Sequence, residues 1–196
     1  MKATLQKGEE LGFGSFGSVY RATELTTGRM VALKKSRVSL RVKRTHLQHE
    51  AQILQLLSGH PAIPQVYAYG RIEHFELLSM QLLGQTLKKV VKEKGPLPIG
   101  VVIEIADQLL SVLEHIHGKG LVHRDTKPEN ILARAPGSWN VCLIDFGLAY
   151  PAPREIPTAK YSSDPSQAAR VFGTLPYTSL NAHEGLSKVF ARSFDG

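Results

Sequence analysis

His123-Arg124-Asp125-Thr126-Lys127-Pro128-Glu129-Asn130 is the stretch of this sequence that decides its fold. Two of its side chains, those of Asp125 and Asn130, are five residues apart in a polar loop that precedes an apolar strand. That strand, Val141 to Ile144, is followed directly by Asp145-Phe146-Gly147. A carboxylate at a strand end, followed by Phe and Gly, suits a metal ligand on a hinge. The two segments together predict a site for charged chemistry.

A glycine-rich segment lies near the N-terminus. Gly12, Gly14 and Gly17 form a G-x-G-x-x-G pattern, and a glycine has no Cβ to keep the backbone away from a phosphate. A dinucleotide-binding turn would open a helix inside this motif. Here Val19-Tyr20-Arg21-Ala22 continues as a strand, which favours a phosphate loop within a β-hairpin.

Lys34 ends the next predicted strand, Met30 to Lys34, where it could hold phosphate charge or simply be an exposed strand-end lysine. Glu50 falls on the helical stripe that carries Leu54 and Leu57. A carboxylate on a core-facing stripe needs a partner, because an unpaired buried charge is costly. We therefore expect Glu50 to pair with Lys34.

The predicted secondary structure changes in type near Gly84. Before it, the sequence predicts strands and one helix; after it, mostly helices. The predicted elements are a hairpin with its turn at Thr26–Gly28, a helix through Leu47–Leu57, strands at 64–70 and 75–82, helices at 86–93 and 99–117, a strand at 140–144, and a long loop at 150–171. The long helix is expected to present Val102, Ile105, Ala106, Leu109, Val112, Leu113 and Ile116 on one broad face. This order suggests two lobes.

Together, in this order and at these spacings, the motifs resemble the signature of the protein kinase superfamily, over about residues 5 to 187. Within it, the chain is similar to the casein kinase 1 group. Three segments carry that resemblance: Met80-Gln81-Leu82-Leu83-Gly84 with Thr86-Leu87, His115-Ile116-His117, and Ser179-Leu180-Asn181-Ala182-His183.

The resemblance implies an α+β, bilobal protein-kinase-like fold. Residues 1–84 would form an N-lobe of antiparallel sheet plus one helix, and residues 85–196 a partial, mainly α-helical C-lobe. The implied reaction transfers the ATP γ-phosphoryl group to Ser or Thr hydroxyls of a protein substrate, with Mg²⁺ as cofactor.

The resemblance also assigns roles to single residues. Asp125 would accept the proton of the substrate hydroxyl, Lys127 would steady the γ-phosphate, and Thr174 would contact both. Asn130 and Asp145 would hold Mg²⁺, and Lys34, paired with Glu50, the α- and β-phosphates. The implied nucleotide-binding set is Leu11, Gly12, Gly14, Gly17, Val19, Ala32, Lys34, Glu50, Met80 as gatekeeper, Gln81, Leu83 and Leu132.

Two departures from the group matter. Gly173-Thr174-Leu175-Pro176-Tyr177 lacks the arginine with which the group reads a phosphate or acidic residue upstream of the target serine. After Leu186 the sequence stops resembling the group, so part of the C-lobe is expected to be missing. We therefore expect the helix at 99–117 to leave an apolar patch exposed, and a partner to cover it. A non-catalytic nucleotide-binding or docking module is the alternative reading.

Composition excludes several classes. The chain has 196 residues, one cysteine and a formal net charge of +7. A single cysteine, Cys142, allows no intrachain disulfide, and no apolar stretch suits a membrane span. We therefore expect the protein to be intracellular, in the cytoplasm or the nucleus. Residues 34–44 carry six basic and no acidic side chains. The run is short and lacks interleaved aromatics, which favours a solvated loop over a nucleic-acid partner.

Overall fold

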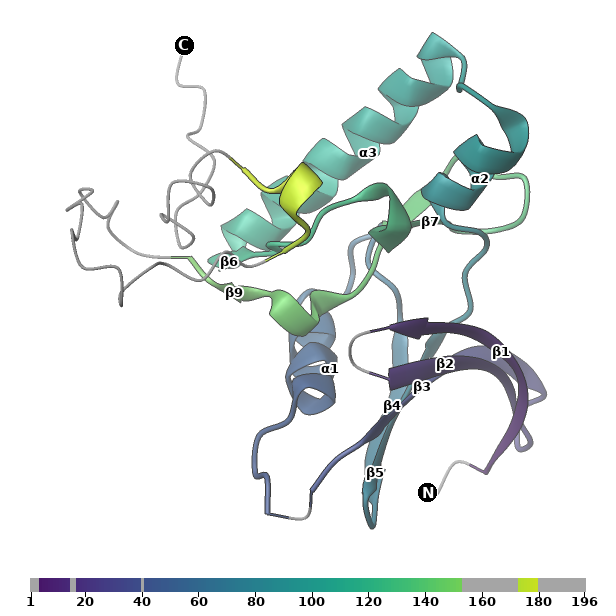
Figure 1. Ribbon diagram of the computed structural model, residues 1–196, viewed down its shortest axis with the longest axis vertical. Helices are drawn as coiled ribbons and strands as arrows, with labels where there is room; N and C mark the ends of the chain where they lie inside the picture. The colour runs from purple at the N-terminus through teal and green to yellow at the C-terminus, as the bar shows by residue number, and fades with distance from the viewer. Residues whose placement is uncertain (1–3, 15–16, 40, 153–172, 180–196) are drawn as a thin grey trace, which may run out of the picture.

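Five antiparallel strands build the N-terminal part of the chain, in the order β1-β2-β3-β5-β4 (Figure 1). The computed structural model describes residues 4–14, 17–39, 41–152 and 173–179. The strands are β1 (Leu5–Gly14), β2 (Gly17–Glu24), β3 (Arg29–Arg37), β4 (Val66–Ile72) and β5 (Phe75–Gln81). The predicted hairpin turn joins β2 and β3, and Gly28 takes a φ of 70° there, a conformation that favours glycine.

The register of β3 against β5 sets the two faces of this sheet. Lys34 lies opposite Leu78, and Ala32 opposite Met80, so these side chains share one face. All four are buried. On this face, the buried amine of Lys34 therefore lies beside the apolar side chains of Ala32, Leu78 and Met80.

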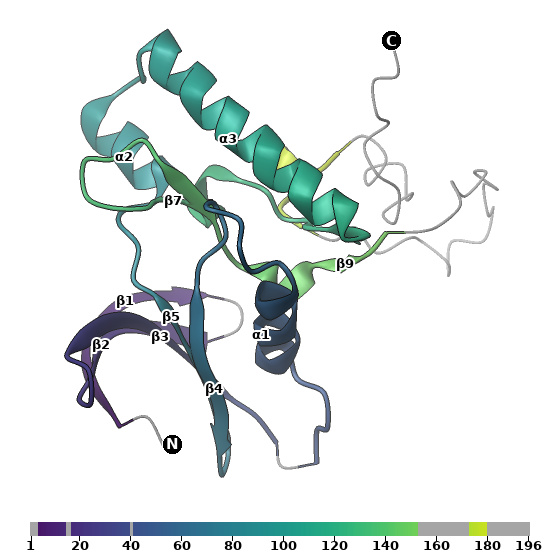
Figure 2. The ribbon, with the colours of Figure 1, turned by 180° about the vertical axis from the view of Figure 1, so that it is seen from behind.

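Helix α1 (His46–Leu56) packs between the sheet and the rest of the molecule, as both views show (Figures 1 and 2). The side chain of Thr45 caps its N-terminus by accepting a hydrogen bond from the Gln48 N–H at 3.2 Å. Its inner face buries Leu47, Ala51 and Leu54. The predicted helix and its buried stripe are thus confirmed.

In its described residues, the second lobe contains two α-helices and several short strands. Its elements are α2 (Leu87–Lys94), α3 (Ile99–Gly118), β6 (Leu121–Val122), β7 (Ile131–Ala133), β8 (Val141–Leu143) and β9 (Tyr150–Pro151), with 3₁₀ turns η1 (Pro128–Asn130), η2 (Phe146–Leu148) and η4 (Leu175–Tyr177). One apolar core runs through both lobes, from Leu54 and Leu78 to Ile116, Leu143 and Phe146. The expected α+β, partially bilobal architecture is confirmed.

Helix α3 differs in part from the predicted face. Ile105, Val112 and Ile116 are buried, but Val102 is 44% exposed and Ala106 is exposed as well. Together with Ile99, Ile103 and Leu110, which are 75%, 61% and 68% exposed, they form an apolar face toward solvent. Helical periodicity predicts which residues share a side but not how wide a strip the neighbours cover. The expected exposed apolar patch is present.

Three other expectations concern the long loop and the C-terminal segment, the basic run at 34–44, and membrane spans. Most of the loop at 150–171 and the sequence beyond Ser179 lie outside the described residues. The basic run is exposed at Arg37, Arg41, Lys43 and Arg44, whereas Lys34 is only 8% exposed, so the strand-end surface reading of that lysine is wrong. Within the described residues, no helix combines the length and apolarity needed to cross a bilayer.

Candidate active site

Lys34 lies at the centre of a buried charge cluster. Its Nζ donates to Glu50 Oε2 at 2.7 Å and to Asp145 Oδ1 at 3.0 Å. Burial alone would lower the pKa of Lys34, but the two carboxylates outweigh it and raise that pKa above its ordinary value. The expected Lys34–Glu50 pair is therefore present, and the lysine is fully charged at neutral pH.

Glu50 is the more deeply buried partner, with 3% of its side chain exposed. Burial raises the pKa of Glu50; Lys34 opposes that shift, and the second carboxylate, Asp145, adds to it. One lysine between two carboxylates carries a net negative charge, so the cluster suits a further cation beside the half-exposed Asp145.

Asp145 reaches the cluster because the chain turns sharply after β8. Its φ is 65°, a left-handed conformation that is uncommon for a residue other than glycine. The next residue, Phe146, is fully buried and meets the ring of His123 edge-on at 4.7 Å between centroids. Burial of this phenyl ring holds the strained turn, and the turn aims the carboxylate at Lys34.

A second network surrounds Asp125. Lys127 Nζ donates to Asp125 Oδ2 at 2.7 Å and to Thr174 Oγ1 at 2.7 Å, and Thr174 donates to Asp125 Oδ1 at 2.8 Å. Asn130 Nδ2 donates to the backbone oxygen of Asp125 at 2.8 Å and to Asp125 Oδ2 at 3.0 Å. The expected contact of Thr174 with both charged residues is present.

These donors control the charge of Asp125. Burial would raise its pKa, but the hydrogen bonds from Lys127, Thr174 and Asn130 outweigh burial and hold the pKa below its usual range. At neutral pH the group is a carboxylate. It sits 7% exposed, with both of its oxygens oriented by donors.

His123 belongs to the scaffold of this loop. Its Nδ1 accepts from the Asp125 N–H at 3.2 Å, so its Nε2 carries the proton that it donates to Ile144 O at 3.0 Å. Burial lowers the pKa of His123, and the ring is therefore neutral. It ties the loop to the strand that leads to Asp145.

Two glycines are required by close backbone approach. A Cβ on Gly17, whose φ is 125°, would stand 2.2 Å from Lys35 O in β3. A Cβ on Gly173, whose φ is 103°, would stand 2.5 Å from Arg124 O. Gly12, by contrast, has open space around its would-be Cβ. The glycine-rich pattern thus serves sheet geometry at Gly17 and leaves room at Gly12.

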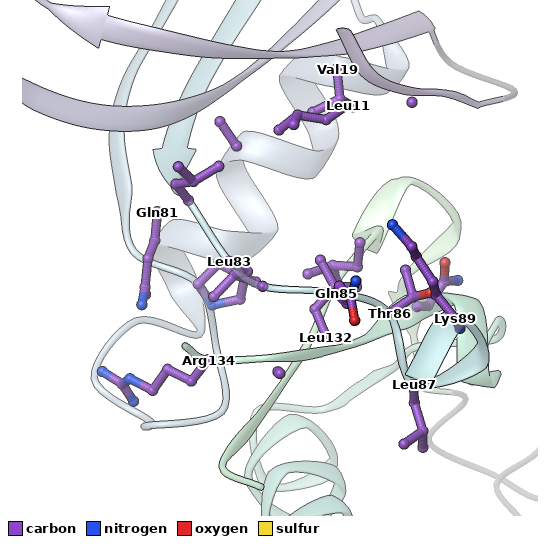
Figure 3. A pocket seen from close by; sticks show the side chains of 18 of the residues that line it. Leu11, Val19, Gln81, Leu83, Gln85, Thr86, Leu87, Lys89, Leu132 and Arg134 are labelled. Carbon is purple, nitrogen blue, oxygen red and sulfur yellow. The ribbon is translucent and has the colours of Figure 1, made fainter. Parts of the chain in front are cut away.

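A cleft of about 1280 Å³ lies between the lobes. Figure 3 shows Leu11 and Val19 on one wall, Leu132 on the opposite one, and Leu83 on the segment that joins the lobes. The cleft gathers most of the predicted residues, namely Leu11, Gly12, Gly17, Val19, Ala32, Lys34, Glu50, Met80, Gln81, Leu83, Asn130, Leu132 and Asp145. Asp125 and Lys127 are not among its lining residues, but they connect to it through Asn130.

The backbone of the segment joining the lobes offers specific hydrogen-bonding groups. The Gln81 N–H is taken by Gln65 O at 2.8 Å, and the Gly84 N–H by Ala133 O at 2.8 Å. Between them, the N–H and C=O of Leu83 have no protein partner within the described ranges. Of Gln81 and Leu83, both in the nucleotide-binding set that the resemblance implies, Leu83 thus keeps both its backbone donor and its backbone acceptor.

Sequence reasoning missed part of the cleft. Gln85, Thr86 and Lys89 line it near α2, and Trp139 lines it from the turn between β7 and β8. Figure 3 shows Gln85, Thr86 and Lys89 grouped on that side. These positions follow from how α2 packs over β7, and no spacing in the sequence marks them.

Asn130 and Asp145 each offer an oxygen atom that could bind a metal ion. Both amide hydrogens of Asn130 are spent on Asp125, so its amide oxygen remains as a ligand. Asp145 supplies a carboxylate, and oxygen donors are those that Mg²⁺ prefers. Among the described residues, no group of three or more His, Cys, Asp or Glu could hold a metal by itself. Oxygens from a bound phosphate would therefore complete the shell.

The family comparison agrees with this geometry. The family described as "Protein kinase domain" matches residues 5–179, nearly the whole chain. The match covers both charge networks and the residues that line the interlobe cleft. A protein kinase domain implies ATP, usually with Mg²⁺, and a protein substrate. With its five-stranded antiparallel sheet, its interlobe cleft and this match, the chain belongs to the protein kinase domain family.

Proposed function

We propose that this chain is an ATP-dependent serine/threonine kinase of the casein kinase 1 type. The observation that carries the proposal is the Asp125 carboxylate, held by Lys127, Thr174 and Asn130. Lys127, two residues after Asp125, is the feature typical of Ser/Thr kinases. The casein kinase 1 assignment rests on the segments 80–87, 115–117 and 179–183.

The nucleotide would lie in the interlobe cleft. Leu11, Val19 and Ala32 from the sheet, and Leu132 from below, offer the apolar walls for adenine. The N–H and C=O of Leu83 would hydrogen-bond its edge, whereas the Gln81 N–H is already taken by Gln65. Met80, 9% exposed at the back, would limit how deep a ring can enter.

Phosphate charge would meet Lys34, which Glu50 and Asp145 keep protonated and in place. Asn130 and Asp145 would hold Mg²⁺, which when bound neutralises charge that builds on the phosphate oxygens. Lys127 has two partners, Asp125 and Thr174, and from there it can also steady a transferred γ-phosphoryl group.

Asp125 orients the substrate hydroxyl and accepts its proton. The Ser or Thr oxygen forms a bond to the γ-phosphorus, the bond from that phosphorus to the β-γ bridging oxygen breaks, and ADP leaves. A carboxylate with a low pKa is a weak base, so it takes the proton late, after most of the P–O bond has broken. Such a base contributes about 10²–10⁴ in rate. Because the 173–177 segment lacks the group's arginine, this proposal does not extend to the group's selectivity for an upstream phosphate or acidic residue.

The test is transfer of labelled γ-phosphate from ATP to casein, compared with Asp125→Asn. That variant keeps the size of the side chain and its contacts with Lys127 but cannot accept the proton. We expect labelled phosphoserine or phosphothreonine, and a loss of at least 100-fold in the variant. Wild-type transfer no faster than that of the variant would refute catalysis. ATP binding without transfer would then favour the alternative, a non-catalytic nucleotide-binding module.

A further inference from the structure

Glu76 is a buried carboxylate that the proposed chemistry does not use. It lies in β5, on the same sheet face as Leu78 and Met80, and is 1% exposed. Within the part of the chain that the structure describes, no lysine, arginine or histidine forms an ion pair with it. A buried carboxylate without a cation costs folding free energy that a leucine at this position would not. Its presence therefore calls for a role.

Two hydroxyl groups satisfy one oxygen of this carboxylate. Thr45 Oγ1 donates to Glu76 Oε1 at 2.5 Å, and Tyr69 OH donates to the same atom at 2.6 Å. Burial and the bond to Glu76 raise the pKa of Tyr69 to about 12, so the phenol stays a donor across the physiological range. Thr45 accepts from the Gln48 N–H at the same time, as the N-cap of α1.

The two polar contacts between α1 and the sheet are about equally far apart on the helix and on the sheet. On α1, Thr45 precedes Glu50 by five residues, about 7.5 Å along a helix. On the sheet, Glu76 precedes Leu78, the neighbour of Lys34, by two residues, about 7 Å along a strand. Helix α1 is thus fixed to the same sheet face at two polar points, Thr45–Glu76 and Glu50–Lys34, at nearly equal spacing.

From this arrangement we propose that Glu76 is a positioning residue: its bond to Thr45 fixes the N-terminus of α1 and thereby sets Glu50 against Lys34. With only one polar point, a helix can pivot on the sheet, and Glu50 would move away from the amine. With two points it cannot. Tyr69 donates to the same oxygen from β4, so replacing it by Phe removes one donor to the carboxylate and keeps the Thr45–Glu76 hydrogen bond. The kinetic part of this proposal rests on the proposed function, whereas the structural part does not.

The variant Glu76→Leu removes the link and keeps the apolar fit, and Tyr69→Phe is its matched control. With ATP and casein, we expect Glu76→Leu to lower kcat/KM by about 10- to 100-fold, the scale of a misplaced catalytic group. Tyr69→Phe should lower it by less than about 3-fold, and Glu76→Gln, whose amide oxygen can still accept from Thr45, should restore most of the activity. Equal losses in Glu76→Leu and Tyr69→Phe would overturn the proposal.

A double-mutant cycle separates positioning from general destabilisation. In a Glu50→Gln background the placement of α1 matters little, so adding Glu76→Leu should cost less than about 3-fold more. A full, additive loss would overturn the proposal. Measurements are made well below the thermal midpoint of each variant, so that unfolding does not contribute.

Hydrogen exchange tests the link without turnover. Amides of residues 46–52 should exchange about 10-fold faster in Glu76→Leu, while those of β2 and β3 stay as in wild type. Unchanged exchange in α1, or equal acceleration throughout the sheet, would overturn the proposal. A chain that transfers no phosphate but shows this local change would refute the proposed function and support the positioning role.

Discussion

Replacing Thr174 by valine removes one hydroxyl and keeps the side-chain shape. That hydroxyl donates to Asp125 Oδ1 and accepts from Lys127 Nζ. A hydrogen bond to a charged group is worth about 1.5–3 kcal/mol. Two are lost, but the direct Lys127–Asp125 contact at 2.7 Å remains and takes over part of their effect. We therefore expect the transition state to lose about 2–3 kcal/mol of stabilisation, which lowers kcat/KM about 30- to 150-fold.

The pH dependence gives the prediction its direction. Donors hold the pKa of Asp125 below its usual range, so removing one should raise that pKa toward the ordinary value. The base form is the active one, and the acidic limb of the kcat/KM profile should therefore move to higher pH in Thr174→Val. The free energy of unfolding should also be lower in Thr174→Val at neutral pH, because a native pKa below the unfolded value of about 3.9 stabilises the fold above that pH. The stability difference between wild type and variant should shrink as pH falls through the native pKa of Asp125.

The assay is kcat/KM for casein phosphorylation across pH, with chemical denaturation at neutral pH and near pH 3. Thr174→Ser is the matched control, since it keeps the hydroxyl and loses only a methyl group. It should retain the wild-type acidic limb. An unmoved limb in Thr174→Val, or an equal loss of activity in Thr174→Ser, would refute the reasoning.

Three further predictions test other parts of the site. Gly17→Ala should lower the unfolding midpoint and weaken ATP binding, because the added Cβ would meet Lys35 O, whereas Gly12→Ala should leave the midpoint unchanged. Thermal unfolding of both variants with and without ATP checks this, and equal shifts of the midpoint in the two variants would contradict the geometry. Glu50→Gln should destabilise by less than the about 3–5 kcal/mol typical of a broken buried pair, because Lys34 keeps Asp145, and a loss above that range in denaturant titration would argue against this sharing. Replacing both Ile103 and Leu110 by lysine should reduce binding of a hydrophobic dye without lowering the midpoint, and unchanged dye fluorescence would show that the α3 face is not the exposed apolar surface.

Much of the local structure could be predicted from residue patterns. Thr45 and Thr86 begin α1 and α2 through side-chain caps, and glycines mark the hairpin turn and the end of α2. The glutamate on an apolar stripe predicted a buried partner, and Lys34 is that partner. These predictions succeed because capping, turn geometry and helical periodicity act over a few residues.

Other features depend on contacts that no local pattern encodes. Periodicity placed Val102 and Ala106 on the same broad face of α3 as the buried Ile105 and Val112, but no neighbour among the described elements covers these two residues. The Asp125–Thr174 contact joins residues 49 apart, and it was expected only through the resemblance to kinases. The Thr45–Glu76 bond, across 31 residues, was not expected at all.

The sequence by itself determined the order of the motifs, the chemistry of each side chain and the start of each helix. These are properties of short segments, and the physical forces behind them are local. Only the tertiary structure decided that two polar contacts hold α1 against the sheet, and that the Leu83 backbone keeps its hydrogen-bonding groups available. Such choices depend on burial, which raises the cost of every unpaired charge and is fixed only when distant segments pack together.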